Sequence, residues 1–204
     1  MTKAQVPGEI YGTPGGSLDS YSTWGTGDQG RADIGKKGEV KTAAILDRLA
    51  LQPGGPTVVH DLKIPLKRIN ANIDHVVVSG RKVLIIDSKV WKPGRYWTFG
   101  GTSRRGFERV DHVQKKTMEM ATDAMAGYFR QQNCDATLLT PVVAIWPSSA
   151  GTTSLRFLQV PGADAIAASR LTSKRGVGQV LGKNVVRGNT ADPYIVSALV
   201  RLLN

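Results

Sequence analysis

The spacing of apolar and polar residues predicts the regular elements of the first half of the chain. Apolar residues recur at helical spacing in DIGKKGEVKTAAILDRLAL, and QPGGP marks the end of that helix. TVVHDLKIP is typical of a short strand. The segment NIDHVVVSGRKVLIIDSKVW, residues 72–91, holds two apolar runs around a Ser-Gly-Arg-Lys turn and therefore predicts a β-hairpin.

The second half of the chain continues the same kind of pattern. We expect a long helix over residues 108–131, strands in TLLTPVVAIWP and SLRFLQV, and a short helix in PGADAIAASRL. DPYIVSALVRLLN predicts a final helix with Asp192 as N-cap and Pro193 in its first turn. The order α-β-β-β-α-β-β-α-α predicts a mixed α/β sheet flanked by helices.

Composition divides the chain into an arm and one domain. Residues 1–32 are rich in Gly, Ser, Thr and Pro, which favours a flexible N-terminal arm. Residues 33–204 suit a single domain, in which 169–204 form a basic extension and the last helix. Residues 91–109 read as an irregular basic and aromatic loop.

Charge and cysteine content narrow the class of protein. The chain has 27 Lys and Arg against 16 Asp and Glu, a net charge of +11. Such a balance favours nucleic acid or an anionic membrane surface as partner, with a merely basic protein as the alternative. No apolar stretch approaches the ~20 residues of a membrane helix. The single cysteine, Cys134, suits a reducing compartment, so we expect a cytoplasmic protein that binds nucleic acid.

Charged residues inside the apolar hairpin are its unusual feature. If Gly80-Arg81 is the turn, Ser79 faces Lys82 and Asp74 falls opposite Asp87 on the same face of the sheet. Like charges at that position are ~5 Å apart and repel. A divalent cation with a preference for oxygen ligands would relieve the repulsion. The alternative is a strand end at which Asp87 and Lys89 form an ordinary ion pair.

The same hairpin resembles a known signature. Asp74 followed by Asp87-Ser88-Lys89 is similar to the PD-(D/E)XK nuclease motif, and IDHVVV and DSKVW are closer still to the nuclease-related domain (NERD) family. The Gly-Glu pair in GKKGEVKTAAILDRL and a glutamine in VDHVQKK also match. The resemblance runs from about Gly35 to Trp146. It implies a restriction-endonuclease-like fold, a mixed sheet with flanking helices.

The resemblance also implies a role for each matching residue. Asp74 and Asp87 would hold Mg²⁺ or Mn²⁺, with the Ser88 carbonyl and Glu39 as further ligands. Lys89 would orient the attacking water or stabilise the phosphate in the transition state. Gln114 would orient the lysine or the substrate. As alternatives, Glu39 is a surface residue of its helix and Gln114 caps an edge of the core.

Cations and aromatic rings alternate after the hairpin. This pattern suits phosphate neutralisation and base stacking, especially on single-stranded or distorted DNA. The alternative is an ordinary hairpin whose rings cover the core. Lys174 and Arg175 lie in a second basic region that tracks a backbone or is simply solvated. The candidate nucleic-acid-binding residues are Lys92, Arg95, Tyr96, Trp97, Arg104, Arg105, Arg109, Lys174 and Arg175.

The sequence thus predicts a Mg²⁺-dependent deoxyribonuclease, a small stand-alone enzyme of a mobile element. A second reading is a basic DNA-binding module that keeps the nuclease fold but does not cleave. A third is an accessory protein of a plasmid or phage nucleoprotein complex. A homodimer is compatible with cutting both strands of a duplex, but no segment of the sequence identifies an interface.

Overall fold

A mixed seven-stranded sheet forms the centre of the protein. The structure is a computed structural model that describes residues 6–16, 29–66, 71–171 and 189–203. The strand order is β1-β2-β3-β4-β9-β11, and β8 also pairs with β4. The strands are β1 (Ile10–Tyr11), β2 (Thr57–Lys63), β3 (Asn72–Ser79), β4 (Lys82–Trp91), β8 (Thr137–Leu138), β9 (Val142–Pro147) and β11 (Asp164–Ala167).

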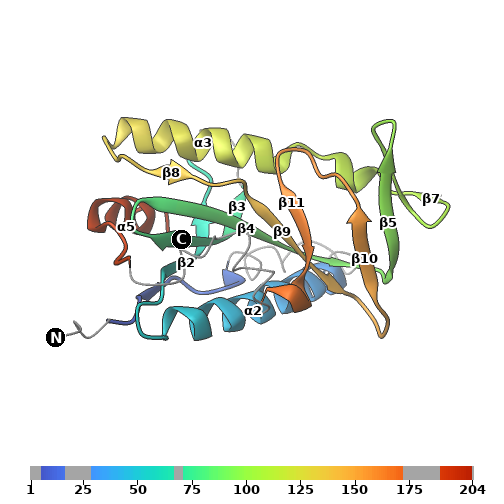
Figure 1. The fold of residues 1–204 in the computed structure, drawn as a ribbon, viewed down its shortest axis with the longest axis horizontal. Helices are drawn as coiled ribbons and strands as arrows, with labels where there is room; N and C mark the ends of the chain where they lie inside the picture. Colours follow the sequence, from blue (N-terminus) through green and yellow to red (C-terminus); the bar gives the residue numbers. More distant parts are fainter. Residues whose placement is uncertain (1–5, 17–28, 67–70, 172–188, 204) are drawn as a thin grey trace.

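Helices cover both faces of this sheet. Helix α2 (Gln29–Ala50) packs on one face through Leu46 and Ala50, while α3 (Thr117–Gln131) and α5 (Pro193–Val200) pack on the other. Figure 1 shows α2 and α3 on opposite sides of the sheet. The fold is the mixed α/β arrangement with flanking helices that the sequence predicted, consistent with a restriction-endonuclease-like fold.

The predicted hairpin and the predicted final helix are both present. Strands β3 and β4 pair in the expected register, with Ser79 opposite Lys82. Their interior residues are almost all buried, which is why apolar side chains dominate both faces. In α5, the Asp192 carboxylate accepts hydrogen bonds from the N–H groups of Tyr194 and Ile195, with Pro193 at the first turn.

A second sheet replaces the irregular loop that the sequence predicted after the hairpin. It has the order β10-β5-β6-β7, with β5 (Gly94–Phe99), β6 (Thr102–Arg105), β7 (Glu108–Arg109) and β10 (Thr153–Phe157). Turns at Gly100-Gly101 and Gly106, all with positive φ, join strands too short to show a clear alternation. This sheet stands at one end of the molecule and α5 at the other (Figure 1).

Two predicted helices were wrong in part. The long helix over 108–131 is instead β7, a 3₁₀ turn η1 (Asp111–Gln114) and α3, because Lys115 is extended and interrupts the helical run. The short helix in PGADAIAASRL is strand β11, parallel to β9, followed by the 3₁₀ turn η2 (Ala168–Arg170). A short apolar run is ambiguous between helix and buried strand, which explains the second error.

The N-terminal segment also contributes to the main sheet. Strand β1 pairs parallel with β2, and the Tyr11 hydroxyl donates to Glu9. Residues 6–16 of the predicted flexible arm therefore pack against the domain. Lys174 and Arg175 lie outside the described residues. None of the described helices has the length and hydropathy needed to span a membrane.

Candidate active site

The carboxylates of the hairpin gather where β3 and β4 stop pairing. The recorded pairs run from Ser79–Lys82 to His75–Ile86, and Asp74 and Asp87 are the next residues on their strands. Asp74 Oδ2 accepts a hydrogen bond from the main-chain N–H of Ser88 at 2.6 Å. The acids therefore lie across neighbouring strands at one end of the ladder, as their spacing in the sequence predicted.

Lys89 completes this end of β4. Its Nζ donates to Asp87 Oδ1 at 2.7 Å, and its side chain is about half exposed, 48%. Burial by itself lowers the pKa of Lys89, but Asp87, Asp74 and Glu39 outweigh burial and raise that pKa above its usual value. The ammonium therefore stays protonated near neutral pH. In this form it can donate hydrogen bonds and stabilise negative charge, but it cannot accept a proton as a base.

Glu39 reaches the same region from α2. It is only 9% exposed, and within the described residues its carboxylate makes no hydrogen bond or ion pair. Burial raises the pKa of Glu39 to about 7; Lys89 opposes this shift, and Asp61 and Asp87 add to it. A buried carboxylate with no hydrogen-bonding partner is costly unless a cation or a proton compensates it.

The negative charge of Asp74, like that of Glu39, is disfavoured by its surroundings. Burial raises its pKa well above the ordinary value of an aspartate, and repulsion from Asp87 and Glu39 adds to that effect. Lys89 and the Ser88 N–H act in the opposite direction. Close carboxylates with raised pKa values are typical of functional sites, although structural ion-pair networks produce them too.

Asp61 of β2 is a further acid that the sequence did not single out. It lies between the recorded pairs His60–His75 and Leu62–Ile73, at the level of Asp74. It is buried, has φ of 55°, and accepts a hydrogen bond from Asn72 Nδ2 at 2.7 Å. Its signal in the sequence was a charge inside the apolar strand TVVHDLK, at the position that faces Asp74.

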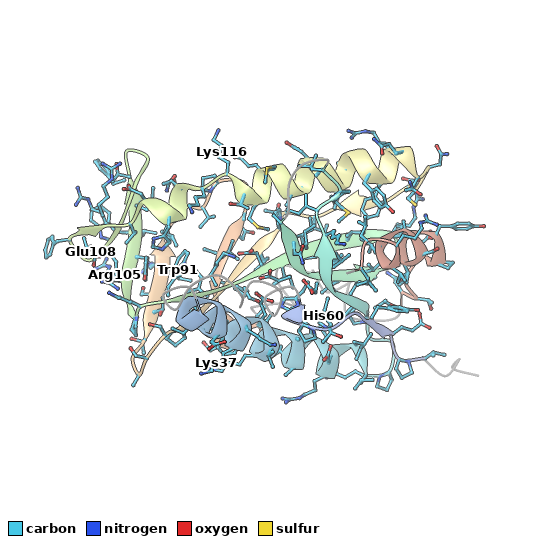
Figure 2. All side chains as sticks on the ribbon, turned by 180° about the vertical axis from the view of Figure 1, so that it is seen from behind. Lys37, His60, Trp91, Arg105, Glu108 and Lys116 are labelled. Carbon is cyan, nitrogen blue, oxygen red and sulfur yellow. The ribbon has the colours of Figure 1, made fainter. Side chains whose placement is uncertain are left out.

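The opposite face of the hairpin carries a network of hydrogen bonds that ends on a carboxylate, because His60 Nε2 lies 2.9 Å from Asp47 Oδ1. The His60 and His75 Nδ1 atoms are 2.8 Å apart, and His75 Nε2 lies 3.1 Å from Ser88 Oγ. Ser88 Oγ donates to Thr42 Oγ1, which also accepts from the Trp146 indole. Burial and His60 lower the pKa of His75 well below its usual value, so His75 is neutral. Figure 2 shows His60 in the interior, away from the second sheet.

Gln114 lies against the second sheet. Its amide donates to the Ser103 hydroxyl and to the Gln159 carbonyl. Among the described residues, no hydrogen bond joins Gln114 to Lys89, which donates to Asp87 instead. In the second sheet, Tyr96 is 2% exposed and its hydroxyl donates to the Lys92 carbonyl. Its ring is therefore part of a small core and cannot stack on a base in this conformation.

The cations of the second sheet differ in their partners. Arg105 pairs with Glu108, and Arg109 pairs with Asp111. Arg104 donates to the Phe107 carbonyl and lies over the Trp97 ring. Arg105 and Glu108 project together at the outer end of the molecule (Figure 2). Lys92 and Arg95 are exposed beside them.

The donor chemistry at β3, β4 and α2 fits a hard divalent cation. Carboxylate and carbonyl oxygens are the ligands that Mg²⁺ prefers, and Glu39 is a buried carboxylate that has no hydrogen-bonding partner among the described residues. The side chains do not surround a site for this cation in the present conformation. In the described part of the chain, no three His, Cys, Asp or Glu side chains lie close enough together to bind a metal ion. Asp87 is bonded to Lys89 and Asp74 to Ser88 instead.

Comparison with known proteins is consistent with this geometry. Searches of curated proteins and of solved structures gave no match. The family model of the nuclease-related domain (NERD) matches residues 34–145, which is more than half of the 204-residue chain. The match includes Glu39, the whole β3–β4 hairpin, Gln114 and most of β9. The chain belongs to the nuclease-related domain family.

Proposed function

We propose that this protein is a Mg²⁺-dependent nuclease that hydrolyses phosphodiester bonds in DNA. The observation that carries the proposal is the set of Asp74, Asp87 and Lys89 at one end of the hairpin. Glu39 is buried near them and, in the part of the chain that the structure describes, has no hydrogen-bonding partner. A basic protein with net charge +11 would attract the polyanionic substrate to this site.

Each residue of the set has a distinct part in this proposal. Asp74, Asp87, Glu39 and the Ser88 carbonyl would hold Mg²⁺ or Mn²⁺. When bound, the ion would polarise the phosphate and supply a water of lowered pKa. Lys89 is protonated, so its N–H groups would donate to the attacking water or to a phosphate oxygen, where negative charge develops. Gln114 would act on the substrate only if its amide left Ser103.

Cleavage of a supercoiled plasmid tests the proposal directly. We expect the wild type to cut with Mg²⁺ or Mn²⁺ and not with EDTA, and Asp87→Asn and Lys89→Ala to lose cleavage. The matched controls are Asp123→Asn and Lys82→Ala, because Asp123 is exposed on α3 and Lys82 lies at the turn end of the hairpin, away from the acids. Both controls should cut like the wild type. A wild type that binds DNA but never cuts it would rule out the enzyme.

The second candidate is a DNA-binding module that keeps the fold without cleaving. It is favoured by one observation, that Asp87 is bonded to Lys89 and the described acids form no metal-binding group. Under this reading the acid cluster is a remnant and the cations of the second sheet carry the function. The plasmid assay separates the candidates, because Mg²⁺ would then leave the wild type inactive while its DNA binding persists.

A further inference from the structure

The outward face of the second sheet carries a row of aromatic and cationic side chains. Phe157 of β10 is in register with Trp97 of β5, Trp97 with Arg104 of β6, and Arg104 with Arg109 of β7. Residues paired in register project to the same face of a sheet. Four neighbouring strands therefore contribute one continuous row.

This row faces solvent because the other face of the sheet is already packed. Tyr96 and Ser103, which alternate with Trp97 and Arg104 along their strands, are each 2% exposed. Tyr96 forms a small core with Val110 and Val113. Side chains alternate between faces along a strand, so the residues of the row lie on the side away from this core.

Aromatic rings are unusually exposed on this sheet and its turns. The chain has four phenylalanines, and three are exposed here: Phe99 at 81%, Phe107 at 96% and Phe157 at 53%. The fourth, Phe129, is buried in the main core. A single exposed apolar side chain is ordinary, but a cluster of rings beside cations is typical of a binding surface.

The cations lie close to these rings. The Arg156 guanidinium is 5.2 Å from the Phe157 ring centre, and that of Arg104 is 6.0 Å from the Trp97 ring. Within the described residues neither arginine has a carboxylate partner, whereas Arg105 and Arg109 are paired with Glu108 and Asp111. Arg104 and Arg156 are therefore able to neutralise phosphates without breaking an ion pair.

We propose that this face binds single-stranded DNA. We call it the stacking face and define it by Trp97, Phe99, Arg104, Arg156 and Phe157. Arg156 and Phe157 do not alternate between faces, because the register of β10 shifts between Ser154 and Phe157 and the Arg156 guanidinium lies against the Phe157 ring. Unpaired bases would stack on the exposed rings, and the two arginines would contact the backbone phosphates. A duplex hides the faces of its bases inside the helix, so it would gain only the phosphate contacts.

The stacking face is continuous with the acid cluster along the chain. Strand β4 carries Asp87 and Lys89 and ends at Trp91, and β5 begins three residues later at Gly94. Strands β9 and β10 make a second connection between the two sheets, and β4 and β9 run toward the end where β5 and β10 stand (Figure 1). The inference rests on the proposed function in one respect: it names an unpaired segment as the part of the substrate held beside the site.

Binding is measured by fluorescence anisotropy of a labelled oligo-dT of about 15 nucleotides and of a duplex of equal length. The whole 204-residue chain is used in EDTA, so the binding measurement does not depend on cleavage. We expect Phe99→Leu combined with Phe157→Leu to weaken single-strand binding about tenfold or more, and duplex binding less than about twofold. Phe99→Tyr with Phe157→Tyr keeps the rings and should restore the affinity.

The arginines are tested by the salt dependence of single-strand binding. Arg104→Ala with Arg156→Ala should reduce the slope of log K against log salt by about 1.4, since each phosphate contact to a single strand contributes about 0.7. Arg48→Ala, an exposed arginine at the end of α2, removes a charge elsewhere and should leave the slope unchanged. All these side chains are partly or fully exposed, so the variants should fold.

The outcomes separate this inference from the proposed function. If the leucine variant binds oligo-dT like the wild type, or if the wild type prefers the duplex, the stacking face is not a single-strand site, whatever the protein cleaves. If the leucine variant loses single-strand binding and the wild type never cuts in Mg²⁺, the stacking face stands and the nuclease proposal fails.

Discussion

The two faces of the β3–β4 hairpin are polar at the same end of the sheet, but their polar groups are satisfied in different ways. On the face toward α2, His60, His75, Ser88 and Thr42 pair with one another and are fully or almost fully buried. On the other face, Asp74 is partly buried, and burial together with repulsion from Asp87 and Glu39 raises its pKa. The first arrangement stabilises the fold without a ligand. The second is unfavourable by itself, which is expected of groups that bind a cation or substrate.

The largest difference between the faces should appear in cleavage. Asp74→Asn should reduce plasmid cleavage in Mg²⁺ by at least about 10²-fold, because it removes a negative ligand at the proposed centre. Its free energy of unfolding in EDTA should stay equal or rise, since a partly buried carboxylate repelled by Asp87 and Glu39 is lost and the amide oxygen still accepts from Ser88. Urea denaturation measures the second quantity; a large loss of stability would show that Asp74 is structural.

The second prediction concerns how the stability of the protein depends on pH through Glu39. The pKa of Glu39 is about 7 in the folded protein against an ordinary value of 4.5, so the folded state holds more protons between these pH values. Stability from this group is therefore lost as pH rises from 4.5 to 7. In EDTA, Glu39→Gln should be more stable than the wild type by up to about 3 kcal/mol at pH 8 and equal to it below pH 4.5.

Thermal melts of both proteins from pH 4 to 8 measure this effect. Glu9→Gln serves as the control, because Glu9 is an exposed carboxylate near the N-terminus. If the Tm of Glu39→Gln followed the same dependence on pH as that of the wild type, the raised pKa of Glu39 would be contradicted.

The hydrogen-bond network on the face toward α2 should respond differently, because its loss should lower stability and leave cleavage unchanged. Thr42→Val keeps the shape of the side chain but leaves the Ser88 hydroxyl and the Trp146 indole N–H without an acceptor. We expect a loss of about 2 kcal/mol in the free energy of unfolding, with cleavage near the wild-type rate. Thr42→Ser retains the hydroxyl and should recover most of the stability. If Thr42→Val lost cleavage but not stability, the roles of the two faces would be reversed.

The smallest expected effect is stabilisation by the ion itself. At ten times its dissociation constant, Mg²⁺ should stabilise the wild type by about 1.4 kcal/mol, seen as a higher Tm. Asp87→Asn should show no such shift. The Thr42→Val variant should have a lower Tm without Mg²⁺, and its Tm should rise by the same amount when Mg²⁺ is added. Equal shifts in the wild type and Asp87→Asn would place the ion elsewhere.

The sequence predicted the hairpin more completely than the second sheet, for physical reasons. The turn at Gly80 and the long apolar strands determine one register, and that register alone brings Asp74 to the level of Asp87. The strands β5 to β7 are short and mostly half exposed. Their alternation of apolar and polar residues is therefore weaker than that of a long, half-buried strand. Their order in space also depends on β10, a partner more than fifty residues away in the chain.

Two single residues, Asp61 and Gln114, also show what the sequence alone could not predict. Asp61 was visible as a charge in an apolar strand, but only the β2–β3 register shows that it lies at the level of Asp74. Gln114 matched the family pattern by position, yet the break at Lys115 places it on η1, where its amide bonds Ser103. Long-range packing decides both cases, and no local pattern in the sequence contains that information.

The hydrogen bond from Ser88 N–H to Asp74 has a consequence for the integrity of the main sheet. Beyond the His75–Ile86 pair, the recorded ladder between β3 and β4 stops, and within the described residues the Ser88 N–H bonds the Asp74 side chain instead of the main chain of β3. Ser88 is buried, and a buried main-chain donor without a partner is costly. Asp74→Ala should therefore weaken the join between these two strands and lower Tm, whereas Asp74→Asn keeps an acceptor and should not.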